Sequence, residues 1–200
     1  MESAAIIDRL KAETLPNHTR LEGSPLLLPL ARQGVDRGSY QRLLALFYGY
    51  FHPLEALIDR FPAVHAFLPD YPRRRKADWL LQDLQQVVPS SEYRIPLLCD
   101  NLPEINHDSQ ALGCLYVMEG STLGGQYISR VLAHQLGLEA STGARFFNGY
   151  GAETAHHWKA FQRALVAFNE QRGEPDLIIE AANQTFEKLS GWLATESVPT

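Results

Sequence analysis

Apolar residues recur at intervals of three and four along most of the chain, and this spacing predicts α-helices. The first run places Ile7, Leu10, Thr14, His18 and Leu21 on one helix face. The same period predicts the remaining helices over residues 39–61, 74–88, 108–136, 153–171 and 176–194. No strand-like alternation of any length is present. The pattern therefore predicts an all-α fold of about seven helices.

Prolines mark the expected interruptions of this pattern. Pro16 is expected to kink or restart the first helix, and Pro53 to bend the second, because proline removes a backbone hydrogen bond inside a helix. Residues 62–72 are expected to form a loop. Residues 89–103 are expected to be irregular, with one short helix over 92–100.

Composition limits the classes of function. Hydrophobic residues make up 45% of the chain, enough for a sizeable core, and the net charge of −5 argues against nonspecific nucleic-acid binding. The N-terminal residues lack the apolar centre of a signal peptide, and no run is long enough to span a bilayer. Cys99 and Cys114 stand apart and are expected to be buried without a metal. We expect a cytoplasmic protein without a membrane partner.

The predicted helix over 108–136 contains unusual glycines. Gly120, Gly124 and Gly125 each cost a helix interior about 1 kcal/mol relative to alanine. Gly113, Gly120 and Gly124 lie on one stripe. The stripe fits close packing of another helix, and it also fits close approach of the backbone to a flat ligand. Spacing alone leaves both interpretations open.

His18 lies on the apolar stripe of the first helix, with Lys11 two turns earlier. One interpretation is a core histidine with satisfied hydrogen bonds. The other is a neutral imidazole presented to a metal such as haem iron, which accepts a single proximal histidine.

Two further patterns carry weaker signals. The basic run Arg73, Arg74, Arg75 and Lys76 is expected to be a solvated face, with a docking patch for an acidic electron donor as the alternative. Glu104 and His107 have the spacing of a di-iron ligand pair, but such a site needs the motif twice, so we interpret it as chance.

Four segments together resemble haem oxygenase, especially the bacterial type associated with bacteriophytochromes. LKAETLPNHTRLE is similar to the proximal helix of that family, with His18 at the ligand position and Lys11 seven residues earlier. YVMEGSTLGGQ resembles the distal helix, WKAFQR the propionate-side helix with Lys159 and Arg163, and AANQTFEKLSGWL the closing helix. The resemblance covers residues 6–194, and GSTLGGQ is its most specific single run.

The resemblance implies one compact multi-helix domain of the haem oxygenase type over residues 1–200. Haem would be sandwiched between a proximal first helix and a glycine-kinked distal helix, as both prosthetic group and substrate. His18 would bind the iron, and the propionates would be held by Lys11, Lys159 and Arg163.

The distal residues implied as catalytic are Gly120, Ser121, Gly124 and Gly125. In many members of the family an acidic residue stands where this chain has Ser121, while Glu119 is two positions away on another face. Proton delivery is therefore expected to involve Ser121, backbone groups and water.

The implied reaction uses O2 and an external electron donor, either a ferredoxin or a reductase, or ascorbate in vitro. Its products are biliverdin, carbon monoxide and iron, and a bacteriophytochrome is the implied acceptor of biliverdin. One alternative is a non-catalytic haem-binding protein for storage or sensing on the same fold. Another is a different enzyme on a similar scaffold, such as a thiaminase-like hydrolase or a di-iron oxidase.

Overall fold

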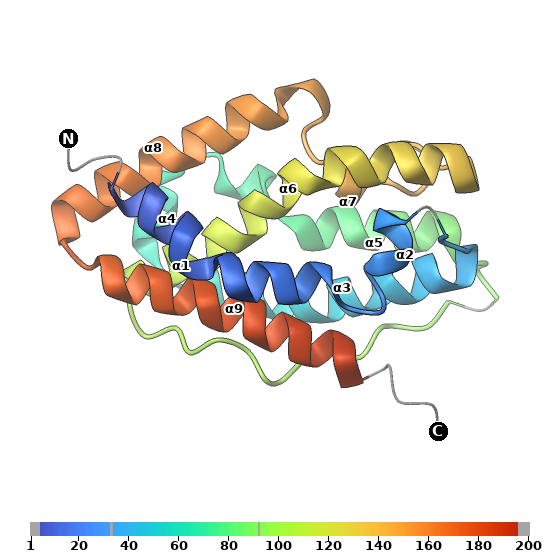
Figure 1. The fold of residues 1–200 in the computed structure, drawn as a ribbon, viewed down its shortest axis with the longest axis horizontal. Helices are drawn as coiled ribbons and strands as arrows, with labels where there is room; N and C mark the ends of the chain where they lie inside the picture. Colours follow the sequence, from blue (N-terminus) through green and yellow to red (C-terminus); the bar gives the residue numbers. More distant parts are fainter. Residues whose placement is uncertain (1–4, 33, 92, 196–200) are drawn as a thin grey trace.

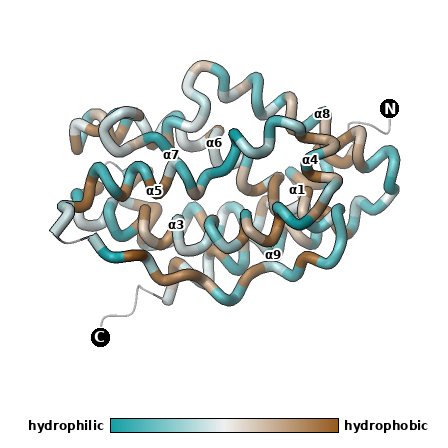
Figure 2. The backbone as a smooth tube through the Cα atoms, turned by 180° about the vertical axis from the view of Figure 1, so that it is seen from behind, coloured by the Kyte–Doolittle hydropathy of each residue, from teal (hydrophilic) through white to brown (hydrophobic). Residues whose placement is uncertain are grey.

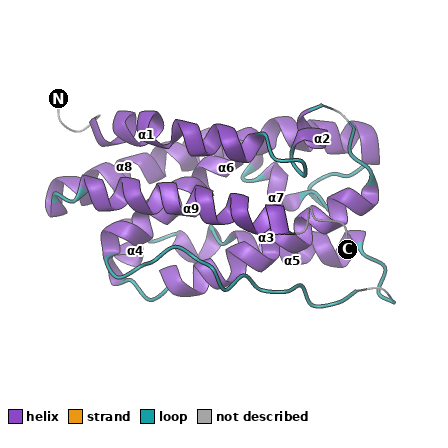
Figure 3. Cartoon of the chain, turned by 60° about the horizontal axis from the view of Figure 1, so that its bottom comes forward, coloured by secondary structure: helices purple, strands orange, loops and turns teal. Residues whose placement is uncertain are grey.

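The computed structural model describes residues 5–32, 34–91 and 93–195, and this part of the chain contains helices and loops but no strands (Figures 1 and 3). The elements are α1 (Ala5–Glu22), α2 (Leu28–Ala31), α3 (Arg37–Ile58), α4 (Pro62–Phe67), η2 (Tyr71–Arg73), α5 (Lys76–Val87), α6 (Asp108–Leu136), α7 (Arg145–Asn148), η3 (Gly151–Glu153), α8 (Thr154–Arg172) and α9 (Pro175–Thr195).

The all-α prediction is confirmed, and α6 has the predicted bounds. Three local predictions are wrong. Residues 62–72 contain α4 and η2 rather than only a loop, because proline fits the first turn of a helix. Residues 93–100 form no helix, and the short α7 was not predicted.

Pro16 neither breaks nor restarts α1, which continues to Glu22. The proline removes the backbone donor that would reach the carbonyl of Ala12. Ala12 and Pro16 are both exposed, so water can hydrate that carbonyl.

Pro53 lies inside α3, and the carbonyl that it leaves without an intrahelical donor belongs to Gly49. The backbone N–H of Cys99 donates to that carbonyl at 2.9 Å. Gly49 also has no side chain to obstruct the backbone of Leu97, which a Cβ would strike. The loop over 93–106 is thus fixed beside α3 by backbone contacts rather than by a helix of its own.

The core forms around α6, which packs on α9, α7 and α8, while α1 lies along α9 and α5 along α3. Hydrophobic and hydrophilic stretches follow one another along the longer helices (Figure 2), as expected for helices with one buried face. α1 and α6 run in roughly the same direction, and α6 changes direction near its middle (Figure 1). Within the described ranges, no helix has the length and apolar character required to cross a membrane.

Candidate functional site

His18 lies on the exposed side of α1. Its side chain is 47% exposed, whereas Leu10, Thr14 and Leu21 of the same helix are buried. Its ring lies 5.4 Å from that of Phe186 on α9, measured between centroids. The interpretation of His18 as a core histidine is therefore wrong, and the imidazole is accessible to a ligand.

Glu22 is a neighbour of His18 that the sequence analysis did not select. Its Oε1 atom lies 3.4 Å from Nε2 of His18, one helical turn away. A carboxylate that holds one imidazole nitrogen fixes the ring orientation and leaves the other nitrogen for a metal. The spacing of four residues was the available signal, but a histidine and a glutamate one turn apart are common on exposed helices.

The side chains of Thr14 on α1 and Tyr116 on α6 lie close together, because the Thr14 hydroxyl opposes the burial that raises the pKa of Tyr116. His18 lies one turn after Thr14, and Gly120 lies one turn after Tyr116. The turns that hold His18 and Gly120 thus both follow this approach, since the two helices run in roughly the same direction (Figure 1). From these turns onward, both helices carry exposed residues.

The glycines of α6 divide into two groups. A Cβ on Gly113 would collide with the carbonyl oxygen of Ile178 in α9, and one on Gly125 with that of Phe147 in α7. A Cβ on Gly120 would meet only Trp158, at 3.8 Å, and one on Gly124 would meet nothing within 4 Å. Helix packing thus explains Gly113 and Gly125, whereas a Cβ on Gly120 would make an ordinary contact with Trp158 and one on Gly124 would face open space.

Exposed apolar side chains flank this open space. Leu15 of α1 is 55% exposed, and Leu123 and Tyr127 of α6 are 44% and 45% exposed. Ser121 is exposed as well, and its hydroxyl donates to the carbonyl of Met118 at 2.8 Å. The exposed turns of α1 and α6 thus offer apolar surface beside a histidine.

Lys159 and Arg163 line a cavity of about 520 Å³ that α8 forms with the first turns of α1. Ile7 and Asp8 of α1 line the same cavity. Lys11 lies one turn after Ile7 and is exposed. The structure thus brings the three predicted cations to one end of the α1 face, and Lys11 precedes His18 by seven residues, about 10 Å along the helix axis.

Arg73 of the basic run is exposed, whereas Arg74 and Lys76 are buried and Arg75 is half-buried, so the run as a whole is neither a solvated face nor a docking patch. Arg74 and Lys76 are 3% and 1% exposed, and they pair with buried Glu119 of α6 at 2.7 and 2.5 Å. Arg75 pairs with Asp59 at 3.0 Å. The sequence could not show this burial, because the carboxylates that pair with the basic run lie far from it along the chain.

Metal-binding side chains do not gather elsewhere in the described ranges, where no group of three or more His, Cys, Asp or Glu residues could hold an ion. Glu104 and His107 precede α6, where the side chain of Gln110 accepts from the backbone N–H of His107. Cys99 and Cys114 are buried and unpaired with each other.

The fold and the site define an all-α protein with an exposed histidine on α1 and an exposed glycine, Gly124, on α6. The chain belongs to the haem oxygenase family, since the family model described as Heme oxygenase matches residues 4–195.

Individual relatives agree with this assignment. The chain is 29% identical over 188 residues to heme oxygenase PigA of Pseudomonas aeruginosa, which covers 92% of this chain and 89% of the relative. The haem oxygenase of Leptospira interrogans superposes with a TM-score of 0.78 at 20% identity, over 95% of this chain and 98% of that one. The NO- and CO-bound enzyme of Neisseria meningitidis gives 0.78 at 23% identity, over 95% and 90%. These structural similarities show the fold.

Proposed function

We propose that haem lies between α1 and α6, with His18 as its iron ligand. As a haem oxygenase, the protein cleaves haem to biliverdin with release of iron and carbon monoxide. The observation that carries the proposed position is accessible His18 on α1 together with Gly120 and Gly124 on α6, where a Cβ on Gly124 would face open space. Bound haem iron supplies the activation of O2.

The residues present fit such a flat, largely apolar group with two carboxylates. Leu15, Leu123 and Tyr127 offer apolar surface that is exposed in the protein alone. Lys11 and the two cations of the α8 cavity, Lys159 and Arg163, are placed to bind propionates by charge-assisted hydrogen bonds.

Glu22 lies 3.4 Å from Nε2 of His18, so its carboxylate is placed to orient the ring while the other nitrogen binds the iron. Gly120 and Gly124 allow the α6 backbone to approach the ring, which a larger side chain would prevent. The Ser121 hydroxyl, now bonded to the Met118 carbonyl, can rotate to hold a water molecule for proton delivery. Gly125 supports the distal helix through its packing on α7.

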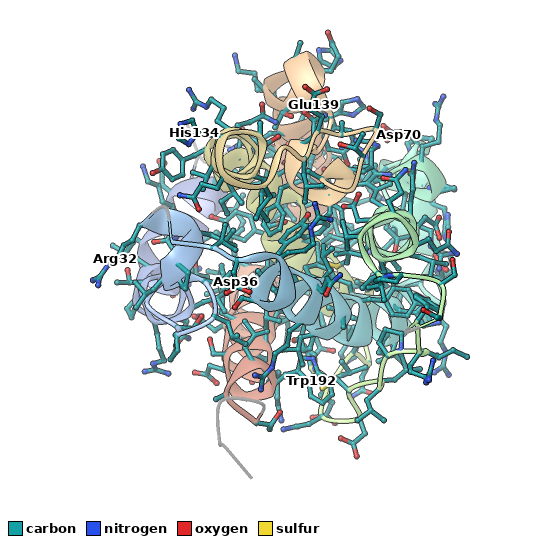
Figure 4. All side chains as sticks on the ribbon, turned by 90° about the vertical axis from the view of Figure 1, so that its right-hand side faces the viewer. Arg32, Asp36, Asp70, His134, Glu139 and Trp192 are labelled. Atoms are coloured by element: carbon teal, nitrogen blue, oxygen red, sulfur yellow. The ribbon has the colours of Figure 1, made fainter. Side chains whose placement is uncertain are left out.

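A titration of the protein with hemin, followed at the Soret band, tests this arrangement. We expect saturable binding with a histidine-ligated spectrum, which the His18→Ala variant loses or alters. His134→Ala is the matched control, because His134 is an exposed histidine near the end of α6 (Figure 4). An unchanged spectrum in His18→Ala would contradict the proposed ligand.

Addition of ascorbate or a ferredoxin system then tests turnover. Decay of the Soret band with growth of a biliverdin band is the expected result. Binding without decay would favour the storage or sensing alternative, and no saturable binding would refute the proposed haem position.

For the electron donor, we propose a ferredoxin or reductase with an acidic surface. Exposed Lys11, Lys159 and Arg163 would attract it to the haem edge. Transfer of biliverdin to a bacteriophytochrome stays a prediction from the sequence resemblance.

A further inference from the structure

Glu119 anchors α6 on a buried face that differs from the proposed haem face. Its carboxylate accepts from Arg74 at 2.7 Å, from Lys76 at 2.5 Å and from the Tyr150 hydroxyl at 2.9 Å. Glu119, Arg74 and Lys76 are all at least 97% buried. We name these four residues the Glu119 cluster.

The Glu119 cluster has little geometric freedom. The Lys76 ammonium has three donors, and they reach Glu119, the Arg74 carbonyl at 2.7 Å and the Tyr150 hydroxyl at 3.0 Å. Arg74 is held in turn by Asp70 at 2.9 Å, at the rim of the molecule (Figure 4). Burial and the charge of Glu119 raise the pKa of Tyr150 far above its ordinary value, so its hydroxyl keeps the proton that it donates.

The turn that Glu119 anchors also carries Gly120, which has no side chain on the proposed haem face. Glu119 immediately precedes Gly120, and Thr122 bonds back to the Glu119 carbonyl at 2.7 Å. Such hydroxyl bonds bend helices, and α6 bends near its middle (Figure 1). Because Gly120 and Gly124 contribute no side-chain contacts, the position of this turn depends on the contacts of the Glu119 cluster.

We propose that Glu119 is a positioning residue for haem cleavage, whose buried ion pairs fix how closely the Gly120–Gly124 backbone approaches the haem. This inference rests on the proposed haem position. A displaced α6 would alter which meso carbon is cleaved and how well a small distal ligand binds, while His18 and the propionate cations still hold the haem.

The test compares the wild-type protein with Glu119→Gln, which keeps the shape but removes the charge. In the haem-free protein, we expect amide hydrogen exchange over 119–125 to rise about tenfold or more. In the hemin complex, we expect the ratio of biliverdin isomers and the affinity for azide each to change by about threefold or more, with hemin affinity nearly constant.

Glu55→Gln is the matched control, because Glu55 is also fully buried and meets the Glu119 cluster only at the backbone N–H of Lys76, from which a glutamine oxygen can still accept. It should leave the isomer ratio and the azide affinity unchanged. Tyr150→Phe removes one donor to Glu119 and provides a milder perturbation, which decides the question if Glu119→Gln does not fold.

Unchanged exchange, isomer ratio and azide affinity in a folded variant would overturn the inference, as would an equal response in Glu55→Gln. These results differ from a failure of the proposed function, in which the wild-type protein itself would not bind hemin.

Discussion

The glycines at 113 and 124 share a stripe of α6 but differ in what a methyl group would meet. Gly113 lies against the backbone of Ile178, and Gly124 faces open space. A methyl group at Gly113 would force α6 and α9 apart, whereas one at Gly124 would only remove backbone freedom from the unfolded chain.

Gly113→Ala should lower the free energy of unfolding of the haem-free protein by about 1–3 kcal/mol or more. Gly124→Ala should raise it by about 0.5–1 kcal/mol, because alanine favours the helix. With hemin and a reductant, Gly124→Ala should nevertheless cleave haem more slowly, since its methyl group occupies the proposed haem face. Urea unfolding and the rate of Soret decay measure both effects. Equal destabilisation by the two substitutions would contradict the division of the glycines.

The sequence could not separate these two glycines, because the deciding neighbours lie far along the chain. Spacing defined the stripe correctly, but the carbonyl of Ile178 is 65 residues beyond Gly113. His18 and Lys11 were found by their place on the predicted helix, but the interpretation of His18 as a core residue is wrong, because its ring contacts Phe186 of α9 while the side chain stays accessible. Resemblance to the family, rather than periodicity, pointed to Lys159 and Arg163 and favoured His18 as an iron ligand.

At the scale of elements, buried carboxylates from other helices bind the first N–H groups of α5 and α7. Glu55 of α3 accepts from the backbone N–H of Lys76 at 2.5 Å and of Ala77 at 3.3 Å. Asp83 of α5 accepts from Arg145 and Phe146 at 2.7 and 2.8 Å. Each bond joins two helices as well as satisfying a helix end.

Glu55 makes stability depend on pH. Burial raises the pKa of its carboxyl to about 7 in the folded protein, above the ordinary value of 4.5, despite the opposing backbone hydrogen bonds. The folded state therefore binds this proton more tightly than the unfolded state. The resulting stabilisation is complete below pH 4.5 and is lost as the pH rises through about 7.

Wild-type protein should thus lose up to about 3 kcal/mol of stability relative to Glu55→Gln between pH 4.5 and 8. Glutamine keeps an oxygen to accept from Lys76 but has no charge to desolvate. Urea unfolding of both proteins at several pH values measures the difference, and a difference that does not vary with pH would refute the prediction.

Elements were predictable where their signals are local. α6 begins after His107, with Gln110 at its third position, and it ends at Gly137 in the left-handed region with φ of 66°. The loop over 93–106 was not predictable in this way, because its conformation depends on the carbonyl of Gly49, which Pro53 leaves without a helical donor. The Glu119 cluster also joins segments more than 40 residues apart.

At the scale of the whole molecule, haem in the proposed position would join α1 and α6, which the fold connects mainly through α9. Hemin at about 100 times its dissociation constant should stabilise the fold by about 2.7 kcal/mol. For a domain of this size, that corresponds to a rise in Tm of about 5–10 °C. Thermal unfolding followed by far-UV circular dichroism measures the rise, which His18→Ala should reduce. A saturated Soret signal without any rise would count against this bridging role.

The exposed apolar residues Leu15, Leu123 and Tyr127 give the reaction a consequence for the lifetime of the protein in the cell. With haem in the proposed position, each turnover destroys the molecule that covers them. The protein then returns to its less stable form, in which local opening and proteolysis are faster. We therefore expect a protease to cleave the haem-free protein faster than the hemin-bound protein.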